Sequence, residues 1–528
     1  MTETPTPDAP AANPIVETVR PGYAFEGPAL ELGGLMIDAE TLSDVHIRIP
    51  LGMLNRHGLV AGATGTGKTK TLQLLAEQLS TQGVPVFAAD IKGDLSGLSA
   101  PGETSEKITA RAASVGQTWE AKGFPVEYFA LGGQGAGITL RATMTSFGPV
   151  LLSKVLGLND TQESSLGLVF HYADQKALPL LDLADLRAVL HFLNSDEGKP
   201  ELKEIGGLST ATAGVILREL VAFEAQGADA FFGEPEFDTK DMLRTTADGM
   251  GVISLVELPN LQDRPAVFST FLMWLLADLF HDLPEVGDPE KPSLVFFFDE
   301  AHLLFADASK DFLQAITQTV RLIRSKGVGV FFVTQSPTDV PDDVLAQLGS
   351  RVQHQLRAAT PNDAKALKAT VNTYPTSSYD DLGKVILSLG IGEAIITVMN
   401  ERGAPTPVAW TRLRAPESLM GPADPAAMDA SVKGSTLFPK YAEAIDRESA
   451  RELLAKKVEA GAAAAEKETA EAEAKGETVP YPKKPSTKAP KKEDSLIVDA
   501  VNSRAGREIL RTAAREIVRG VFGIGRRR

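Results

Sequence analysis

The sequence predicts an α/β fold built around a parallel sheet, and three observations support this prediction. A strand-like stretch ending at residue 61 leads into a glycine-rich loop at 62–69, and apolar residues then recur at helical spacing over 71–82. A second buried-type strand follows at 84–90, which completes a strand–loop–helix–strand unit. The run 294–298 is apolar on both faces, as expected of a central parallel strand covered by helices.

Composition limits the class of protein. The chain has 528 residues, more than one hydrophobic core usually organises, so we expect two or more structural units. The absence of cysteine excludes a disulfide scaffold, a cysteine-ligated metal site and a thiol nucleophile. The net charge is −16, from 53 basic and 69 acidic residues, so any contact with nucleic acid must be local. Neither a signal peptide nor an apolar stretch long enough to cross a bilayer is apparent, and we expect a cytoplasmic protein without a membrane partner.

Shifts in composition and periodicity divide the chain into parts. We expect a disordered leader (1–20), a short N-terminal β segment (21–56), an α/β core in two pieces (57–99 and 251–415), a mostly helical insertion (100–250), a helical C-terminal extension (416–475), a proline-rich linker (476–493) and a basic amphipathic helix (494–528). The second core piece repeats the α/β pattern, with strands near 252–256, 294–299 and 328–334 and helices at 266–281 and 310–326. Two later strands, near 352–356 and 394–399, would complete the sheet.

The glycine-rich loop matches the phosphate-binding pattern G-x-x-x-x-G-K-[ST] in full. Its residues are Gly62, Ala63, Thr64, Gly65, Thr66, Gly67, Lys68 and Thr69. The glycines let backbone N–H groups converge on phosphate oxygens, and the following helix adds its positive end. Lys68 would reach the β- and γ-phosphates, and the Thr69 hydroxyl would ligate Mg²⁺. Because the loop stands between a strand and a helix, as the pattern requires, an ordinary βα turn is the weaker interpretation.

Two acidic residues follow the apolar strand at 294–298. Asp299 would orient Mg²⁺ through water, and Glu300 would polarise the water that attacks the phosphate. The alternative is that the pair only ends a strand and caps the next helix. The phosphate-binding loop upstream, and the continuation to Asp-Glu-Ala-His, favour the catalytic interpretation.

Three further positions leave two interpretations open. Asp90 ends the second strand at the ligand-binding edge, where it could support Mg²⁺ or simply close a turn. Gln335 follows the strand at 328–334, and could sense the γ-phosphate or only begin a loop. Arg324 lies near the end of the helix at 310–326, and could act in a neighbouring subunit's site or only stabilise the helix dipole.

The motifs GATGTGKT, DIKGDLSGL, FFFDEAH, VRLIRSKGVGVFFVTQSP and SRVQHQLRA together resemble the HerA–FtsK branch of P-loop ATPases, in particular the bacterial HerA-like helicase-domain family. The resemblance covers roughly residues 25–415 and the arginine-rich tail. It implies a RecA-like core that uses ATP and Mg²⁺, a homo-hexameric ring, and DNA as the partner that is moved. It also implies that Lys68, Glu300 and Gln335 act in catalysis, and that Arg324 acts in trans, with Arg321 and Arg351 as the next candidates.

The sequence also departs from its relatives. About 40 residues lie between the leader and the loop, too few for a closed eight-stranded barrel, so we do not predict a nuclease partner. The leading hypothesis is an ATP-driven DNA translocase or helicase-like motor. The alternative is a nucleotide-dependent assembly or protein-remodelling ATPase. A small-molecule kinase is disfavoured, since an Asp-Glu pair suits activation of water.

Overall fold

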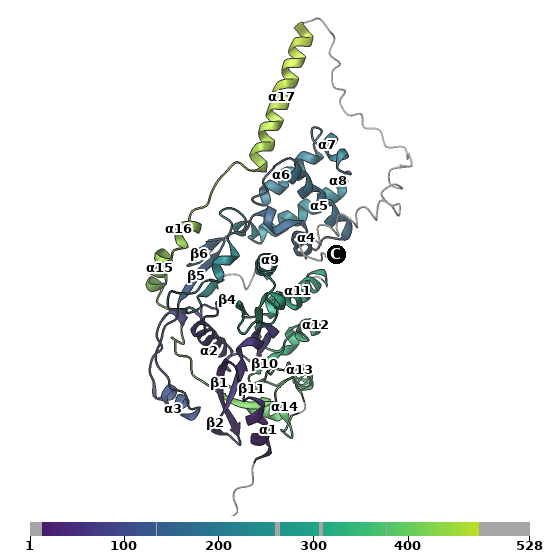
Figure 1. The fold of residues 1–528 in the computed structure, drawn as a ribbon. Helices are drawn as coiled ribbons and strands as arrows, with labels where there is room; N and C mark the ends of the chain where they lie inside the picture. The colour runs from purple at the N-terminus through teal and green to yellow at the C-terminus, as the bar shows by residue number, and fades with distance from the viewer. Residues whose placement is uncertain (1–12, 134, 259–264, 306–309, 376, 475–528) are drawn as a thin grey trace, which may run out of the picture. The chain divides into compact units, whose positions relative to one another are not determined.

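The computed structural model describes residues 13–133, 135–258, 265–305, 310–375 and 377–474 (Figure 1). The chain divides into two compact units. The sheet unit combines Met1–Arg141 with Pro235–Ala444, and the helical unit combines Ala142–Glu234 with Ile445–Arg528. The helical unit is therefore partly an insertion within the sheet unit and partly a C-terminal extension. Among the described residues, none of the helices is both long enough and apolar enough for a transmembrane span.

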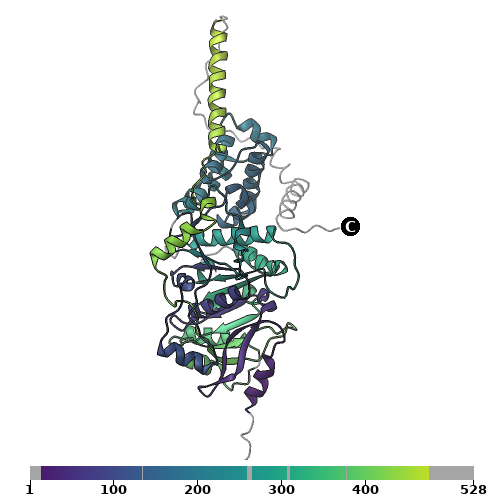
Figure 2. The same ribbon diagram turned by 60° about the vertical axis from the view of Figure 1, so that its left-hand side comes forward.

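A single 12-stranded sheet organises the sheet unit, with the order β2-β1-β12-β11-β10-β3-β9-β8-β4-β7-β5-β6 (Figures 1 and 2). The strands are β1 (Ala29–Ile37), β2 (Glu40–Pro50), β3 (Gly58–Ala61), β4 (Val86–Asp90), β5 (Val126–Leu131), β6 (Ile138–Leu140), β7 (Ile253–Glu257), β8 (Leu294–Phe298), β9 (Val328–Thr334), β10 (Ser350–Gln353), β11 (Glu393–Thr397) and β12 (Ala409–Leu413). Neighbouring strands are parallel from β10 to β6, whereas β11, β12, β1 and β2 pair antiparallel. The predicted α/β core with a parallel sheet is confirmed.

The centre of the sheet is buried on both faces, which explains its continuous apolar runs. Every residue of β3, β4, β8 and β9 is buried. Aromatic rings pack between neighbouring strands, with Phe297 5.4 Å from Phe331 and Phe298 5.7 Å from Phe332 between ring centroids. The register sets Ala61 beside Thr334 and aligns the carboxyl ends of the central strands at one edge.

Helices connect and cover these strands. In the sheet unit they are α1 (Pro14–Gly22), α2 (Lys68–Thr81), α3 (Glu106–Ser114), α9 (Pro265–Asp282), α10 (His302–Phe305), α11 (Lys310–Ile323), α12 (Asp342–Leu345), α13 (Pro361–Asn372), α14 (Leu382–Ser388), α15 (Pro425–Gly434) and α16 (Phe438–Tyr441). Short 3₁₀ turns are η1 (Leu51–Arg56), η2 (Ser96–Ser99), η4 (Thr239–Met242), η5 (Arg324–Lys326) and η6 (Pro337–Asp339). The predicted helix at 310–326 thus ends as α-helix at Ile323 and continues as the 3₁₀ turn η5.

The N-terminus differs from the sequence prediction of a disordered leader over 1–20. The described part begins with α1, whose N-cap Asn13 accepts a hydrogen bond from the Ile15 N–H at 2.9 Å. Pro14 occupies the first helical position, and Val19 is buried. The proline- and alanine-rich composition predicted disorder, but residues 14–22 form a helix with an N-cap. Residues 1–12 lie outside the described residues.

The predicted short β segment at 21–56 is the antiparallel pair β1–β2. Gly33 pairs with Leu413, which joins β1 to β12 at the antiparallel edge of the main sheet. A built Cβ at Gly33 would lie 1.9 Å from the Arg412 carbonyl oxygen, so this close approach requires glycine. The segment extends the core sheet and is not a separate barrel.

The predicted helical insertion at 100–250 differs from the structure at both ends. The helical unit begins at Ala142, because β5 and β6 join the sheet beside β7. Tyr128 and Phe129 of β5 are buried there, in a strand too short to give a clear pattern in the sequence. After Glu234 the chain returns to the sheet unit.

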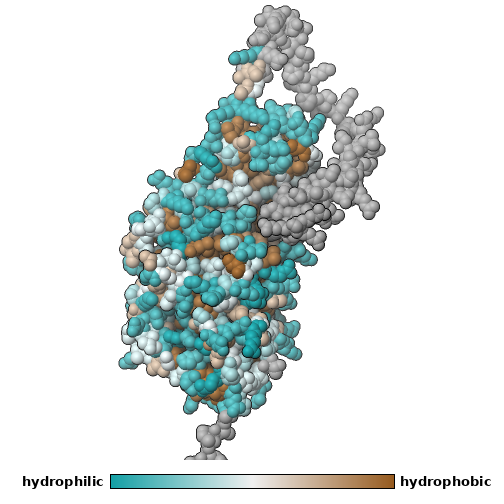
Figure 3. All heavy atoms as spheres, viewed as in Figure 1, coloured by the Kyte–Doolittle hydropathy of each residue, from teal (hydrophilic) through white to brown (hydrophobic). Residues whose placement is uncertain are grey.

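Helices make up the helical unit. They are α4 (Met144–Val155), α5 (Asp160–Gln175), α6 (Leu183–Asn194), α7 (Lys199–Glu204), α8 (Thr210–Ala225), the 3₁₀ turn η3 (Ala228–Phe231) and α17 (Ala450–Ala474). Capping boxes at Asn159 and Asp182 fix the starts of α5 and α6. The face of this unit seen in Figure 3 is mostly hydrophilic, with small hydrophobic areas between the helices.

The predicted C-terminal extension at 416–475 contains α15, α16 and α17. Its first two helices belong to the sheet unit and α17 to the helical unit. The predicted linker at 476–493 and basic amphipathic helix at 494–528 lie outside the described residues.

A buried histidine stands at the start of β3. His57 has a left-handed backbone (φ 61°), and its Nδ1 accepts a hydrogen bond from the Val330 N–H at 3.1 Å. Burial lowers the pKa of His57 to about 4, with the positive charges of Arg324 and Arg56 acting in the same direction. The imidazole is therefore neutral in the folded protein at pH 7.

We predict that His57 makes the sheet unit acid-sensitive. Because the unfolded chain takes up this proton near pH 6.5 and the folded chain only near pH 4, stability is complete above pH 6.5 and falls as the pH drops towards 4. The loss approaches about 3 kcal/mol. His57→Asn keeps an acceptor for the Val330 N–H but cannot titrate. Urea unfolding at pH 7.0 and 4.5 should show a smaller loss in this variant. Equal losses would contradict the prediction.

Candidate active site

The glycine-rich loop lies between β3 and α2 and is tied to three neighbouring segments. The Gly62 N–H donates to the Thr334 carbonyl at 3.2 Å, and the Ala63 N–H donates to the Gln355 carbonyl at 2.8 Å. The Thr66 carbonyl accepts the Gly392 N–H at 3.0 Å. The loop conformation is therefore held by backbone bonds from β9, from the end of β10 and from the turn before β11.

Two loop glycines are required by close packing. A built Cβ at Gly62 would lie 2.5 Å from the His354 Cβ. Gly67 has φ +118° and lies within 3.4 Å of the Gly392 backbone by the same construction. At Gly65, by contrast, a built Cβ meets nothing within 4 Å, so this part of the loop faces open space. The loop is therefore tightly packed at Gly62 and Gly67 and accessible at Gly65. A loop that binds phosphate needs such an accessible side.

Lys68 and Thr69 occupy the first turn of α2. The Lys68 Nζ donates to the carbonyls of Gly62 at 2.6 Å and Ala63 at 3.3 Å, so the side chain curls over its own loop. Burial lowers the pKa of Lys68, and the charges of Glu300 and Asp299 partly oppose that effect. Thr69 is half-buried. The predicted loop residues and the acidic pair therefore share one electrostatic environment.

Asp299 and Glu300 directly follow β8, as predicted, and both are buried. The Asp299 Oδ1 accepts the Glu300 N–H at 2.9 Å, and Glu300 has a left-handed backbone with φ 49°. Burial raises the pKa of Asp299 to about 6, and the neighbouring Glu300 charge adds to the effect. A non-glycine residue at positive φ costs free energy, and such residues often stand at functional sites.

The sequence reasoning gave no role to Lys92, which lies in the loop after β4. Its Nζ donates a short hydrogen bond to the Glu300 Oε1. Burial acts to raise the pKa of Glu300, but the Lys92 ammonium outweighs it and the pKa is lowered. No local pattern could have predicted this contact, because 208 positions separate the two residues.

The structure decides between the two interpretations of Asp90. Its Oδ1 accepts the N–H groups of Lys92 at 3.2 Å and Gly93 at 2.8 Å, and its Oδ2 accepts that of Leu95 at 2.8 Å. Burial raises the pKa of Asp90, while these three bonds oppose the increase. Asp90 thus orders the loop that carries Lys92.

Gln335 is exposed immediately after β9, at the same edge as the loop. The turn around it is held by Asp339, whose Oδ2 accepts from the Thr334 hydroxyl at 2.7 Å and from the Ser336 N–H at 2.9 Å. The negative charge of Asp339 also acts on Lys68. Asp339 was not singled out by the sequence reasoning, although its spacing from Ser336 is that of a capping box.

The three candidate trans-acting arginines lie apart from the loop contacts described above. Arg324 opens η5, and its Nη2 lies 3.2 Å from the Asp288 Oδ1 in an exposed ion pair. Arg321 is exposed on the last turn of α11. Arg351 is at the start of β10, where it donates to the Thr373 carbonyl at 2.9 Å. Of the three, Arg351 donates to a backbone carbonyl within the fold, Arg321 is exposed, and Arg324 is half-buried and, among the contacts described above, paired only with the exposed Asp288.

His354 is a third residue without a predicted role. It is buried under the loop, and its Nε2 lies 2.9 Å from the Thr71 hydroxyl of α2. Burial lowers the pKa of His354 to about 4, and Lys68 adds to this effect. A neutral imidazole therefore supports the glycine-rich loop from below.

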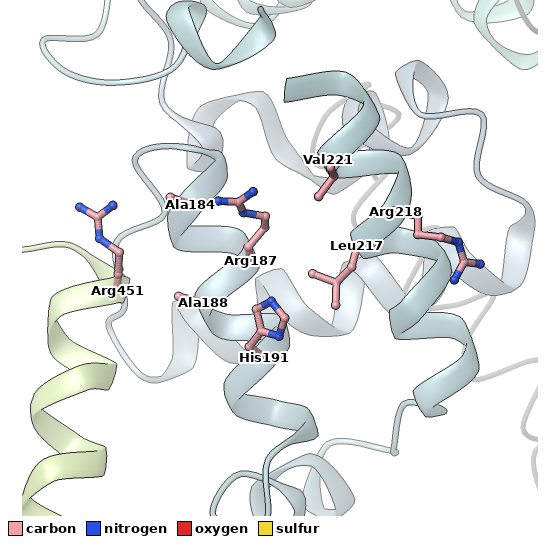
Figure 4. A pocket seen from close by; sticks show the side chains of 8 residues that line it. All are labelled: Ala184, Arg187, Ala188, His191, Leu217, Arg218, Val221 and Arg451. Atoms are coloured by element: carbon pink, nitrogen blue, oxygen red, sulfur yellow. The ribbon is translucent and has the colours of Figure 1, made fainter. Parts of the chain in front are cut away.

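A separate cavity of about 570 Å³ lies in the helical unit between α6 and α8 (Figure 4). Its lining comprises Ala184, Arg187, Ala188, His191, Leu217, Arg218, Val221 and Arg451. Small apolar side chains alternate there with basic ones, and the lining includes no carboxylate. It therefore lacks the chemistry of the loop site.

Comparison with known proteins places this geometry in a family. A family model described as "Helicase HerA-like C-terminal" matches residues 36–528. The chain belongs to the HerA-like family. No curated protein matches the sequence. As a HerA-like protein with an intact phosphate-binding loop and acidic pair, the chain is a P-loop ATPase of the HerA–FtsK superfamily.

Solved structures agree on the fold. The plasmid coupling protein TrwB in complex with ADP and Mg²⁺ is 16% identical, with a TM-score of 0.50 over 76% of this chain and 98% of that chain. An unbound form, bacterial conjugative coupling protein TrwBdeltaN70, is 15% identical, with a TM-score of 0.49 over 77% and 94%. VirB4 of Thermoanaerobacter pseudethanolicus is 13% identical, with a TM-score of 0.44 over 74% and 97%. The similarity to the ADP-bound TrwB structure confirms the predicted RecA-like P-loop fold of this HerA-like chain.

The side chains of the site fit a nucleotide with Mg²⁺. Hydroxyl and carboxylate oxygens, here those of Thr69 and Asp299, are the hard ligands that Mg²⁺ prefers. The loop presents the start of a helix of 14 residues, whose first N–H groups suit phosphate oxygens. The accessible backbone at Gly65 leaves room for such a group.

We predict that Asp339 stabilises the turn carrying Gln335. Asp339→Ala leaves the fully buried Thr334 hydroxyl and the Ser336 N–H without their acceptor, which should lower the free energy of unfolding by about 1–3 kcal/mol. Asp342→Ala, an exposed neighbour in α12, removes the same charge and serves as the matched control. Urea unfolding would measure both. Equal stability of the two variants would contradict this role.

Proposed function

We propose that this HerA-like protein is an ATP-hydrolysing ring motor that works as a homo-oligomer, with a hexamer as the expected form, and translocates DNA. The observation that carries the proposal is the meeting of the glycine-rich loop with Asp299 and Glu300 at one edge of the sheet. The order β3-β9-β8 supports it, because a single strand separates the loop from the acidic pair. The exposed Gln335 follows that intervening strand.

The residues divide the chemistry among them. The loop amides and Lys68 bind and orient the phosphates, and Thr69 with Asp299 would hold Mg²⁺. Mg²⁺, when bound, neutralises phosphate charge and orients the terminal phosphoryl group. Glu300 accepts a proton from the attacking water at a carboxylate oxygen, and the buried setting keeps bulk water away from that oxygen.

The partly exposed position of Arg324 supports action in trans. A guanidinium in an exposed pair with Asp288 is free to contact a neighbouring subunit, since such pairs contribute only about 0–1 kcal/mol. In a ring, that contact would complete each ATP site with a residue from the next subunit.

DNA is the proposed substrate, and an assembly or protein-remodelling ATPase is the alternative. A protein with a net charge of −16 does not attract DNA, a polyanion, by its overall charge. This observation favours the assembly or remodelling ATPase. The deciding experiment measures ATP turnover with and without single- and double-stranded DNA, together with the molar mass in solution. Stimulation by DNA supports the motor. Turnover that ignores both DNAs supports the alternative.

We predict that Lys68 and Glu300 are both needed for hydrolysis, for different reasons. Lys68→Ala should weaken ATP binding, because it removes a charge from the phosphates. Glu300→Gln should bind ATP and lose turnover, because only proton acceptance is lost. Binding titrations and phosphate release would separate the two effects. A Glu300→Gln protein with wild-type turnover would show that the base is another residue.

We predict that Arg324 completes the site of a neighbouring subunit. Arg324→Ala should bind ATP and assemble normally, yet turn over about 10³-fold more slowly, because transition-state charge is left without its partner. Asp288→Ala breaks the same ion pair but keeps the guanidinium, and should stay active. Mixing Arg324→Ala with Lys68→Ala should restore some turnover at interfaces with one intact loop and one intact arginine. Wild-type turnover by Arg324→Ala, or no recovery on mixing, would rule out this role.

A further inference from the structure

The loop after β4 is built to hold one lysine in place. Asp90 accepts three backbone N–H groups from this loop, including that of Lys92 itself. Gly93 has φ +76°, so the turn follows a path that a residue with a side chain rarely takes. The buried Asp90 carboxylate thus holds the backbone of the Lys92 loop, whereas the Lys92 side chain can change its partner.

The Lys92 side chain joins this loop to the proposed catalytic base. Its Nζ bonds the Glu300 Oε1, while the Glu300 Oε2 lies 3.2 Å from the His302 Nδ1. The Glu300 side chain is 7% exposed, whereas that of Lys92 is 37% exposed. The base is therefore enclosed, and the cation that binds it remains open to the site.

The sheet places this cation at the same edge as the phosphate-binding loop. Ala89 of β4 pairs with Phe298 of β8, so Lys92 and Glu300 stand just beyond the same edge of two adjacent strands. The positive charge of Lys92 also acts on Lys68, together with the charges of Asp299 and Glu300. An anion on the loop would therefore attract Lys92 in competition with Glu300.

We propose that Lys92 is a positioning residue that exchanges the Glu300 carboxylate for the terminal phosphate of ATP. While Lys92 binds Glu300, one carboxylate oxygen is occupied and the base is weakened. The terminal phosphate draws the ammonium away and frees that oxygen for the attacking water. ADP lacks this phosphate and leaves the pair intact. This proposal rests on the proposed function, since it requires ATP at the loop.

Nucleotide binding tests the exchange without relying on turnover. Titrations of the full chain with Mg²⁺ and either ADP or a non-hydrolysable ATP analogue give the preference for the triphosphate. Lys92→Met should lower that preference about tenfold, as expected for one charge-assisted hydrogen bond. Lys92→Arg keeps the charge and should retain most of the preference. Lys70 is a half-buried lysine on α2 that donates to the Gln73 side chain at 3.2 Å, so Lys70→Met is the matched control and should leave the preference unchanged.

Removing the carboxylate tests the other half of the exchange. Glu300→Gln releases Lys92 from its ion pair and should raise the preference for the triphosphate. This gain should be much smaller when Lys92→Met is also present. An unchanged preference in Lys92→Met, or additive effects in the double variant, would overturn the exchange and leave a structural ion pair. Wild-type protein that binds neither nucleotide would overturn the proposed function, and this inference with it.

Discussion

Parallel pairing of β3, β9, β8 and β4 is the constraint on which the rest of the site depends. The carboxyl ends of parallel strands lie at the same edge of the sheet, so the residues that directly follow these strands lie along that edge. The glycine-rich loop, Gln335, the acidic pair and Lys92 each follow one of these strands. β8 and its neighbours are buried at every residue, so apolar side chains fill both sides of this part of the sheet.

Burial of charge governs the chemistry that this edge can support. Asp299 and Glu300 are almost inaccessible, and an isolated carboxylate in such a place would be strongly destabilised. Asp299 and Glu300 respond to burial in two different ways. The pKa of Asp299 rises to about 6 through burial, whereas Lys92 keeps the pKa of Glu300 low despite burial. The two neighbouring acids thereby differ in protonation behaviour.

The antiparallel strands support the loop rather than extend the site. Arg111 of α3 donates to the carbonyls of Ile391 at 2.8 Å and Gly392 at 3.1 Å, and the Gly392 N–H donates to Thr66. His354 fills the space below Gly62. The phosphate-binding loop is thus supported by Gly392 and His354, which lie more than 280 positions away along the chain. A preorganised loop does not have to be ordered when a phosphate binds.

The sequence by itself determined the α/β class, the loop at 62–69 and the acidic pair, because these follow from local periodicity and from residue types at fixed spacing. Local composition misled where tertiary contacts prevail: the proline-rich leader contains α1, and β5 and β6 of the expected helical insertion belong to the sheet. Only the tertiary structure revealed that Lys92 holds Glu300, that Asp90 orders the Lys92 loop and that His354 supports the glycines. The Asp90 bonds are local, but the contacts of Lys92 and His354 join segments more than 200 positions apart. Strand order brings those segments together, and no local pattern encodes strand order.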